Sequence, residues 1–221
     1  MKRDGPTRSS TLTPTDEGSR CTERAYVQVH DAFLRNPHLH AILALTVIFC
    51  KTPSPLQISR VLDISWEDVR QSLVSVCDLL HPPAPPEHYY SDITLSDRLR
   101  KMLSDPACPT TFVDSPRWHA LLAVWCLTRS SIKYDARDIF YASDFWAEHV
   151  CSARPSQDLW NALRRSPIPC QLSSHPMLPW VITWLEEVDV DETRELTMIY
   201  RSILQETPTP FAPGLRMDVV L

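Results

Sequence analysis

Hydrophobic residues recur at helical spacing along most of the chain, in short segments separated by prolines. Val69, Leu73, Val76 and Leu80 fall at i, i+4, i+7 and i+11, which predicts one helix over residues 65–80. The segment 38–49 is apolar nearly all round, which is typical of a buried helix. The same spacing predicts further helices over residues 23–34, 56–62, 95–103, 115–125, 136–151, 159–163, 178–185 and 196–203.

Two helix starts carry clear capping signals. Ser54 precedes Pro55, the order expected of an N-cap followed by proline in the first turn. Ser65 and Asp68 have the spacing of a capping box, and Ile64 can pack against Val69 as a hydrophobic staple. The short helix between two tightly joined neighbours predicts a helix-turn-helix core.

A small β element is expected after this core. The proline-rich segment 81–87 must be a loop, because proline lacks the amide that helices and sheets require. Residues 89–95 are aromatic and β-branched, which predicts a short strand. Three helices followed by such an element have the outline of a winged helix.

The sequence therefore predicts a mainly all-α fold, a winged-helix-like unit followed by an irregular helical bundle. The expected organisation is a disordered tail over 1–20, a leading helix and winged-helix-like domain over 21–115, a helical bundle over 116–206 and a loose tail over 207–221. Only three glycines stand against twenty prolines, and none lies between residues 19 and 213. This composition argues against tight hairpins and glycine-built phosphate loops.

Charge and cysteine content limit the partners and the cellular compartment that we expect for the protein. A net charge of −5 gives no general attraction to nucleic acid or to an anionic membrane. Seven cysteines include no Cys-x-x-Cys pair, so we expect reduced core thiols. No apolar stretch approaches the roughly 20 residues of a membrane span, and no N-terminal signal peptide is evident. We expect a cytoplasmic protein without a cofactor or a membrane contact.

Four ordered segments between His40 and Glu186 resemble the region after the ATPase core in fungal NACHT-type proteins, which are STAND NTPases related to NOD-like receptors. They are His40-Ala-Ile-Leu-Ala-Leu-Thr-Val-Ile-Phe49 with the helix-turn-helix that follows, Lys101-Met-Leu-Ser-Asp-Pro-Ala-Cys108, Tyr141-Ala-Ser-Asp-Phe-Trp-Ala-Glu-His149, and Leu178-Pro-Trp-Val-Ile-Thr-Trp-Leu-Glu186. The third is similar to the family's Tyr-Ala-Cys-x-Tyr-Trp-x-x-His segment, and the fourth to its Leu-x-x-Trp-Leu-Glu helix.

The resemblance implies a coupling arm between an ATPase core and a sensor or recruiting domain, with one of these as protein partner. The chain departs from the family in two ways. Where the family has a His-x-Ser-Phe-x-Asp-Phe-type motif, Ser96 takes the histidine position and Lys101 the aspartate position. No Gly-x-x-x-x-Gly-Lys-[Ser/Thr] phosphate loop occurs. We therefore expect a non-catalytic interaction or signalling module without a nucleotide site, either a fragment or a degenerate descendant.

A DNA-binding transcription regulator is the alternative function, because many winged helices bind DNA. The expected recognition helix, 65–80, carries Glu67, Asp68 and Asp78 against Arg70 alone. Phosphate contacts require cations on this helix, so nucleic acid is not the expected partner.

Catalytic and metal sites find little support in the sequence. There is no Gly-x-Ser-x-Gly and no His-Glu-x-x-His motif, so we expect no enzymatic activity. His149 with Cys151, and Cys170 with His175, do not have the spacing of a structural zinc site. The acidic run from Glu186 to Glu192 lacks the glycine and terminal glutamate of a calcium-binding EF-hand loop.

Two tryptophans are candidates for a partner surface. Trp180 and Trp184 are four residues apart but lie off the Leu178-Val181-Ile182-Leu185 stripe. Interface cores favour tryptophan, which makes the pair a candidate contact for a protein partner. The alternative is that both pack against the adjacent helix of the same chain.

Overall fold

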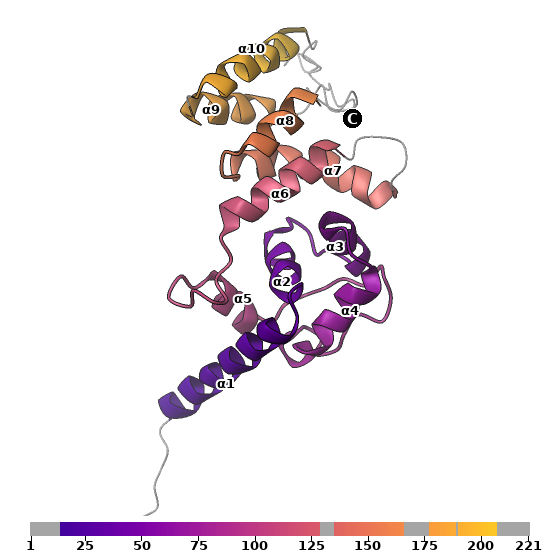
Figure 1. The fold of residues 1–221 in the computed structure, drawn as a ribbon, viewed down its shortest axis with the longest axis vertical. Coiled ribbons are helices and arrows are strands. Elements are labelled where there is room, and N and C mark those ends of the chain that lie inside the picture. Colours follow the sequence, from indigo (N-terminus) through magenta and orange to yellow (C-terminus); the bar gives the residue numbers. More distant parts are fainter. Residues whose placement is uncertain (1–13, 129–134, 166–176, 189, 207–221) are drawn as a thin grey trace, which may run out of the picture. The chain divides into compact units, whose positions relative to one another are not determined.

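The computed structural model describes residues 14–128, 135–165, 177–188 and 190–206. These residues form ten α-helices and one 3₁₀ helix, with no β-strand among them, which confirms the mainly all-α class (Figure 1). Within the same ranges, no helix combines the length and the apolar character needed to cross a membrane. Residues 1–13 of the predicted N-terminal tail and the whole predicted C-terminal tail, 207–221, lie outside the described residues.

The chain divides between Val113 and Asp114 into two compact units. The expected boundary lay after residue 115. The first unit contains α1 (Pro14–Arg35), α2 (Leu39–Ile48), α3 (Pro55–Leu62), α4 (Trp66–Val74) and α5 (Asp97–Ser104). The second contains α6 (Ser115–Thr128), α7 (Ala136–Cys151), α8 (Gln157–Arg165), α9 (Leu178–Val188) and α10 (Asp191–Glu206).

The core of the first unit surrounds α2. This helix packs against α1, α3 and α4, as its nearly uniform apolar character requires. Its buried residues cover every side of the helix: Leu39, Ile42, Leu43, Ala44, Leu45, Thr46 and Ile48. The predicted buried helix over 38–49 is thus confirmed.

Side-chain caps set the starts of α3 and α4 as predicted. Ser54 and Gln57 form a reciprocal capping box, and Pro55 occupies the first turn of α3. Ser65 Oγ accepts the Asp68 amide proton at 3.0 Å and donates to the Asp68 carboxylate at 2.7 Å. Between the helices, Asp63 takes a left-handed φ of 54°, which aspartate tolerates better than most non-glycine residues. These contacts produce the tight helix-turn-helix.

The predicted helix over 65–80 was wrong in its second half. The α-helix ends at Val74, and residues 77–79 form a 3₁₀ turn. Val76, Leu79 and Leu80 are nevertheless buried, so the apolar pattern marks the core correctly but not the helix length. The chain turns here because Leu79 and His81 bond to residues 94–96 rather than continuing the helical ladder.

The predicted strand over 89–95 was also wrong. The described residues contain only an isolated antiparallel bridge between Leu80 and Leu95, flanked by backbone bonds from His81 to Thr94 and from Ser96 to Leu79. The facing segment contains four prolines, at positions 82, 83, 85 and 86, which cannot donate ladder hydrogen bonds. The described residues therefore show helices here but not the β element that a winged helix requires.

The first helix begins earlier than expected. It starts at Pro14, whereas the sequence predicted a disordered tail to residue 20 and a helix from Glu23. Its buried residues Ala25, Val29 and Ala32 lie on one face and pack toward α2 and α5. The first turns of α1 are polar, and their sequence therefore has no periodic apolar pattern from which a helix could be predicted.

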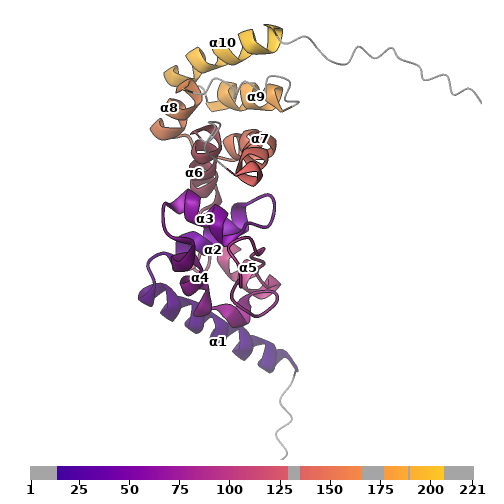
Figure 2. The same ribbon diagram turned by 90° about the vertical axis from the view of Figure 1, so that its right-hand side faces the viewer.

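The second unit is an irregular bundle. Helix α6 packs against both α7 and α8, and α9 lies beside α10, as Figures 1 and 2 both show. Trp146, Leu159, Leu163, Leu185 and Leu196 are fully or nearly fully buried between these helices.

We predict that Ser54→Ala destabilises the first unit by about 1 kcal/mol, because it removes the N-cap of α3. Hydrogen exchange of α3 amides, followed by mass spectrometry, should show correspondingly faster exchange. The control is Ser104→Ala, at an exposed serine at the end of α5. Equal exchange in the two variants would contradict the capping role.

Candidate functional site

The two candidate tryptophans of α9 have different surroundings. Trp180 is 62% exposed. Trp184 is half-buried, and its ring lies 5.5 Å from that of Trp160 in α8, centroid to centroid. Trp184 therefore has the intrachain contact that was the alternative interpretation, whereas Trp180 stays available as a contact residue.

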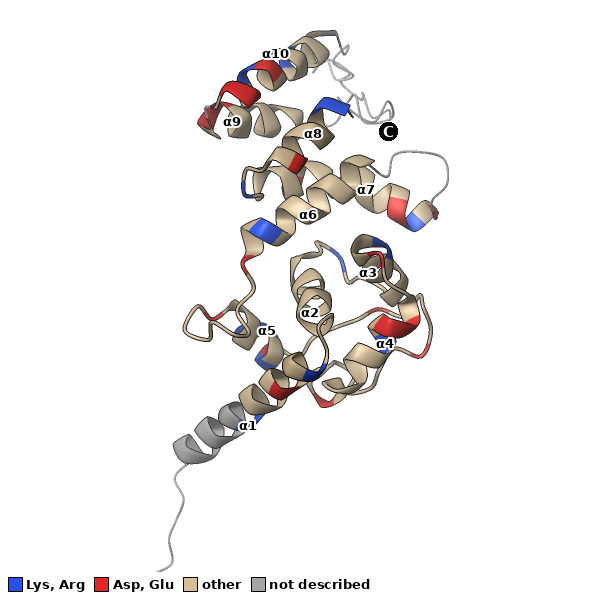
Figure 3. Cartoon of the chain, viewed as in Figure 1, with Lys and Arg blue, Asp and Glu red and all other residues tan. Residues whose placement is uncertain are grey.

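The helix expected to read DNA carries little free positive charge. On α4, Glu67 and Arg70 form an ion pair at 2.7 Å, and Gln71 also donates to Glu67. Asp68 is exposed in the first turn. Figure 3 shows the acidic start of this helix. A phosphate backbone would meet carboxylates here before any cation.

The described residues bring no cluster of possible metal ligands together. No group of three or more His, Cys, Asp or Glu side chains suited to a metal ion occurs in the part of the chain that the structure describes. Cys170, His175 and Asp189 lie outside that part. In the acidic run, Glu186 pairs with Arg201, and Asp191 pairs with Arg194.

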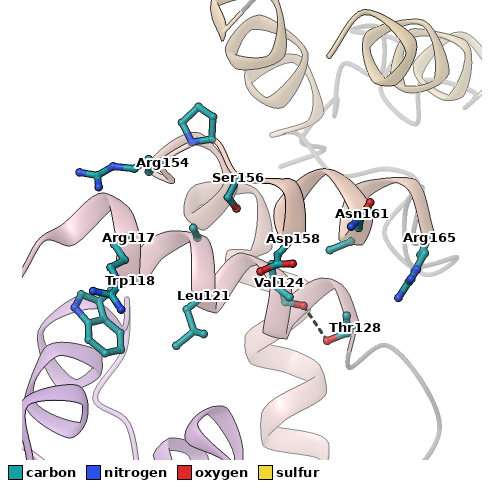
Figure 4. Close-up of a pocket in the computed structure, with 13 residues that line it drawn as sticks. Arg117, Trp118, Leu121, Val124, Thr128, Arg154, Ser156, Asp158, Asn161 and Arg165 are labelled. Carbon is teal, nitrogen blue, oxygen red and sulfur yellow. Dashed lines mark hydrogen bonds between the residues drawn. The ribbon is translucent and has the colours of Figure 1, made fainter. Parts of the chain in front are cut away.

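A groove of about 530 Å³ lies in the second unit, between α6, α8 and the loop before α8 (Figure 4). Leu121, Val124 and Ala162 contribute apolar surface, and Trp118 lies at one end. Its charged lining consists of Arg117, Arg154, Asp158 and Arg165, and its neutral polar lining of Thr128, Ser156 and Asn161.

The groove exists because α6 is apolar on more than one side. Leu122 and Trp125 are buried, while Leu121 remains 39% exposed and faces the groove. Trp118, Leu121, Leu122 and Trp125 have the spacing of one helical face, but Leu122 and Trp125 lie in the core whereas Trp118 and Leu121 line the groove. Exposed leucine beside half-buried tryptophan is an unsatisfied apolar surface of the kind that binding sites use.

The groove wall before α8 is held by specific contacts. The Arg154 amide donates to the Pro116 carbonyl at 2.8 Å, and the Arg154 guanidinium pairs with Asp114 at 3.0 Å. Ser156 Oγ accepts the Leu159 amide proton at 3.3 Å and so caps the start of α8. The two Arg154 contacts therefore join the loop to the start of α6, and the Ser156 cap fixes where α8 begins.

Two arginines of the groove have no ion pair in the described structure. Arg117 lies 5.9 Å from the centre of the Trp118 ring, a cation–π contact. Arg165, in the last turn of α8, is exposed and has no carboxylate partner among the described residues. Sequence reasoning missed both residues, because 48 positions separate them and no motif links them. Only the packing of α6 against α8 brings them to one groove.

A histidine pair lies between α6 and α7, with His149 buried and His119 half-buried. The Nδ1 atoms of His119 and His149 are 2.9 Å apart, and the Tyr141 hydroxyl bonds His149 Nε2 at 2.8 Å. One Nδ1 must donate and the other accept in this hydrogen bond, so the two Nδ1 atoms cannot both carry a proton. Burial, aided by the neighbouring His119, lowers the pKa of His149 to about 3. Burial also lowers the pKa of His119, against the opposing pull of Glu148.

The two thiols described in the second unit, Cys126 and Cys151, are poorly suited to nucleophilic chemistry. Cys126 is buried, and burial together with Glu187 raises the pKa of Cys151 to about 11. A thiol with such a pKa is almost entirely protonated near neutral pH. Within the described residues the groove itself lines up no nucleophile with a histidine base.

Comparison of the chain with protein-family models, with curated proteins and with solved structures gives no match. The resemblance to NACHT-type proteins therefore rests on the four sequence segments alone. What the protein does has to be argued from its own residues.

We predict that Trp184→Ala destabilises the second unit by about 1–3 kcal/mol, since it removes the packing against Trp160. Trp180→Ala should change stability by less than about 0.5 kcal/mol, because that side chain is largely exposed. Urea unfolding followed by circular dichroism measures both. A larger loss for Trp180→Ala than for Trp184→Ala would contradict these assignments.

We predict that the second unit loses stability as pH falls from 6.5 toward 3. Unfolded His149 binds a proton with its ordinary pKa of 6.5, whereas the folded residue resists protonation until about pH 3. As pH falls, the unfolded state therefore binds this proton before the folded state does. Between the two pKa values, His149 lowers the free energy of unfolding by up to about 1.4 kcal/mol per pH unit.

The test is urea unfolding at several pH values, followed by tryptophan fluorescence. A Trp66→Phe background is used, because the remaining tryptophans then all lie in the second unit. His149→Asn should be less stable at pH 7.5, because it loses the bonds to His119 and Tyr141. Its stability should also depend less on pH. The same pH slope in both proteins would exclude His149 as the titrating group.

Proposed function

We propose that the chain is a non-catalytic interaction or regulatory module that acts in the cytoplasm as the coupling arm of a NACHT-type assembly. The groove between α6 and α8 carries the proposal, because it joins an exposed apolar floor to arginines and aligns no catalytic groups in the described residues. Its volume of about 530 Å³ lies within the range of ligand-binding pockets in general.

Three further features support this function. The ordered segments resemble the region after the ATPase core, while the phosphate-loop motif is missing from the sequence. Trp180 adds an exposed aromatic contact on α9 of the same unit. Among the described side chains, Cys50, Cys77, Cys108, Cys126 and Cys151 form no disulfide, in keeping with a reducing compartment.

The features of α4 favour this function over DNA binding. Arg70 is engaged by Glu67, and Asp68 is exposed beside it. Sequence-specific winged helices need their recognition helix to approach phosphates closely, which this charge arrangement opposes.

We predict that the tagged chain, isolated from its native cells, recovers a protein that contains a NACHT-type ATPase core. The groove variant Arg117→Glu/Arg165→Glu should recover much less of it, because two contacts are reversed in charge. Quantitative mass spectrometry of the isolated material measures the difference.

The matched control is Arg100→Glu/Lys101→Glu, which makes the same charge change at two exposed positions of α5. It should recover the partner as the unmodified chain does. Recovery of chromatin proteins that nuclease treatment removes would overturn the proposal in favour of DNA binding. Partners that are insensitive to the groove variant would overturn the role of the groove.

A further inference from the structure

The charges of the groove are arranged along its length. Arg117 lies at one end, in the first turn of α6, and Arg165 lies at the other, in the last turn of α8 (Figure 4). Leu121 and Val124 form the floor between them. Asp158 is the acidic residue of the lining and stands in the middle part of the groove.

The free positive charge is concentrated at the two ends. Asp114 already neutralises Arg154 at 3.0 Å. Neither Arg117 nor Arg165 has an ion pair among the described residues, and Arg117 is held in place by the Trp118 ring. An occupant with carboxylates near both ends would satisfy both arginines, and bidentate pairing with guanidinium groups would orient it.

This arrangement distinguishes among occupants. A single phosphate or carboxylate does not span the groove, because α6 rises about 10 Å over the seven steps from Arg117 to Val124, which both line it. A continuous polyanion such as nucleic acid would meet Asp158 in the middle. A segment with an apolar side chain on Leu121 and acidic residues on either side would reach both arginines and would place no negative charge beside Asp158.

We propose that the groove binds an acidic protein segment that places an apolar side chain on Leu121 and Val124 and carboxylates toward Arg117 and Arg165. This inference rests on the proposed function and adds the chemistry of the partner. The segment is recognised by charge at its two ends and by burial at its centre, so binding weakens as salt screens the arginines.

The test uses two fluorescein-labelled peptides with a central Leu-Trp pair. One carries two glutamates on each side, and the other carries two lysines on each side. Fluorescence anisotropy should show that the full chain binds the glutamate peptide at least about tenfold more tightly than the lysine peptide. Binding of the glutamate peptide should weaken with added sodium chloride.

Variants assign the binding to the groove. Arg117→Glu/Arg165→Glu should weaken the glutamate peptide at least about tenfold and strengthen the lysine peptide. This gain makes the test independent of a general folding defect. Arg100→Glu/Lys101→Glu should bind as the unmodified chain does. Arg117→Gln/Arg165→Gln serves if the reversed variant does not fold.

Equal binding of both peptides, or equal loss in the α5 control, would overturn the inference. The proposed function fails separately. If the isolated ATPase partner depends on the groove while the glutamate peptide does not bind, the interaction module stands and the acidic segment is rejected. If the glutamate peptide binds as described but no NACHT-type protein is recovered, the groove chemistry stands and the coupling arm is rejected.

Discussion

Each unit of the chain depends on covering one helix that is apolar around most of its circumference. In the first unit this is α2, which α1, α3 and α4 surround. In the second it is α6, which α7 and α8 cover only in part. Burying such a helix on several sides yields more hydrophobic free energy than burying one stripe, and it dictates how many neighbours the unit needs.

Incomplete cover of α6 has a structural consequence. Leu122, Trp125 and Cys126 are buried, but Leu121 and Val124 open onto the groove. The loop before α8 is tied to the start of α6 by Arg154, through Pro116 and Asp114. Leu121 stays 39% exposed, and Arg117 and Arg165 lie at opposite ends of the groove.

Buried polar groups in the second unit help to fix how its helices pack, and one of them lowers its folding stability. His149 is fully buried and bonds both His119 and Tyr141, so the register of α7 against α6 is set by directional contacts as well as by apolar packing. The Tyr200 hydroxyl is buried with no hydrogen-bond partner among the described residues, and burial raises its pKa. An unpaired buried hydroxyl costs about 1–3 kcal/mol, which the packing of its ring near Trp146 helps to offset.

Local signals determined the helices, the caps at Ser54 and Ser65, and the all-round burial of α2, because each depends on residues within a few positions of one another. They did not determine where α4 ends or whether residues 89–95 pair, since both depend on long-range bonds between residues 79–81 and 94–96. The sequence singled out Trp180 and Trp184 as one surface, and tertiary packing turned Trp184 toward Trp160. Arg117 and Arg165 share a groove only because α6 packs against α8, a contact that no pattern within either helix encodes.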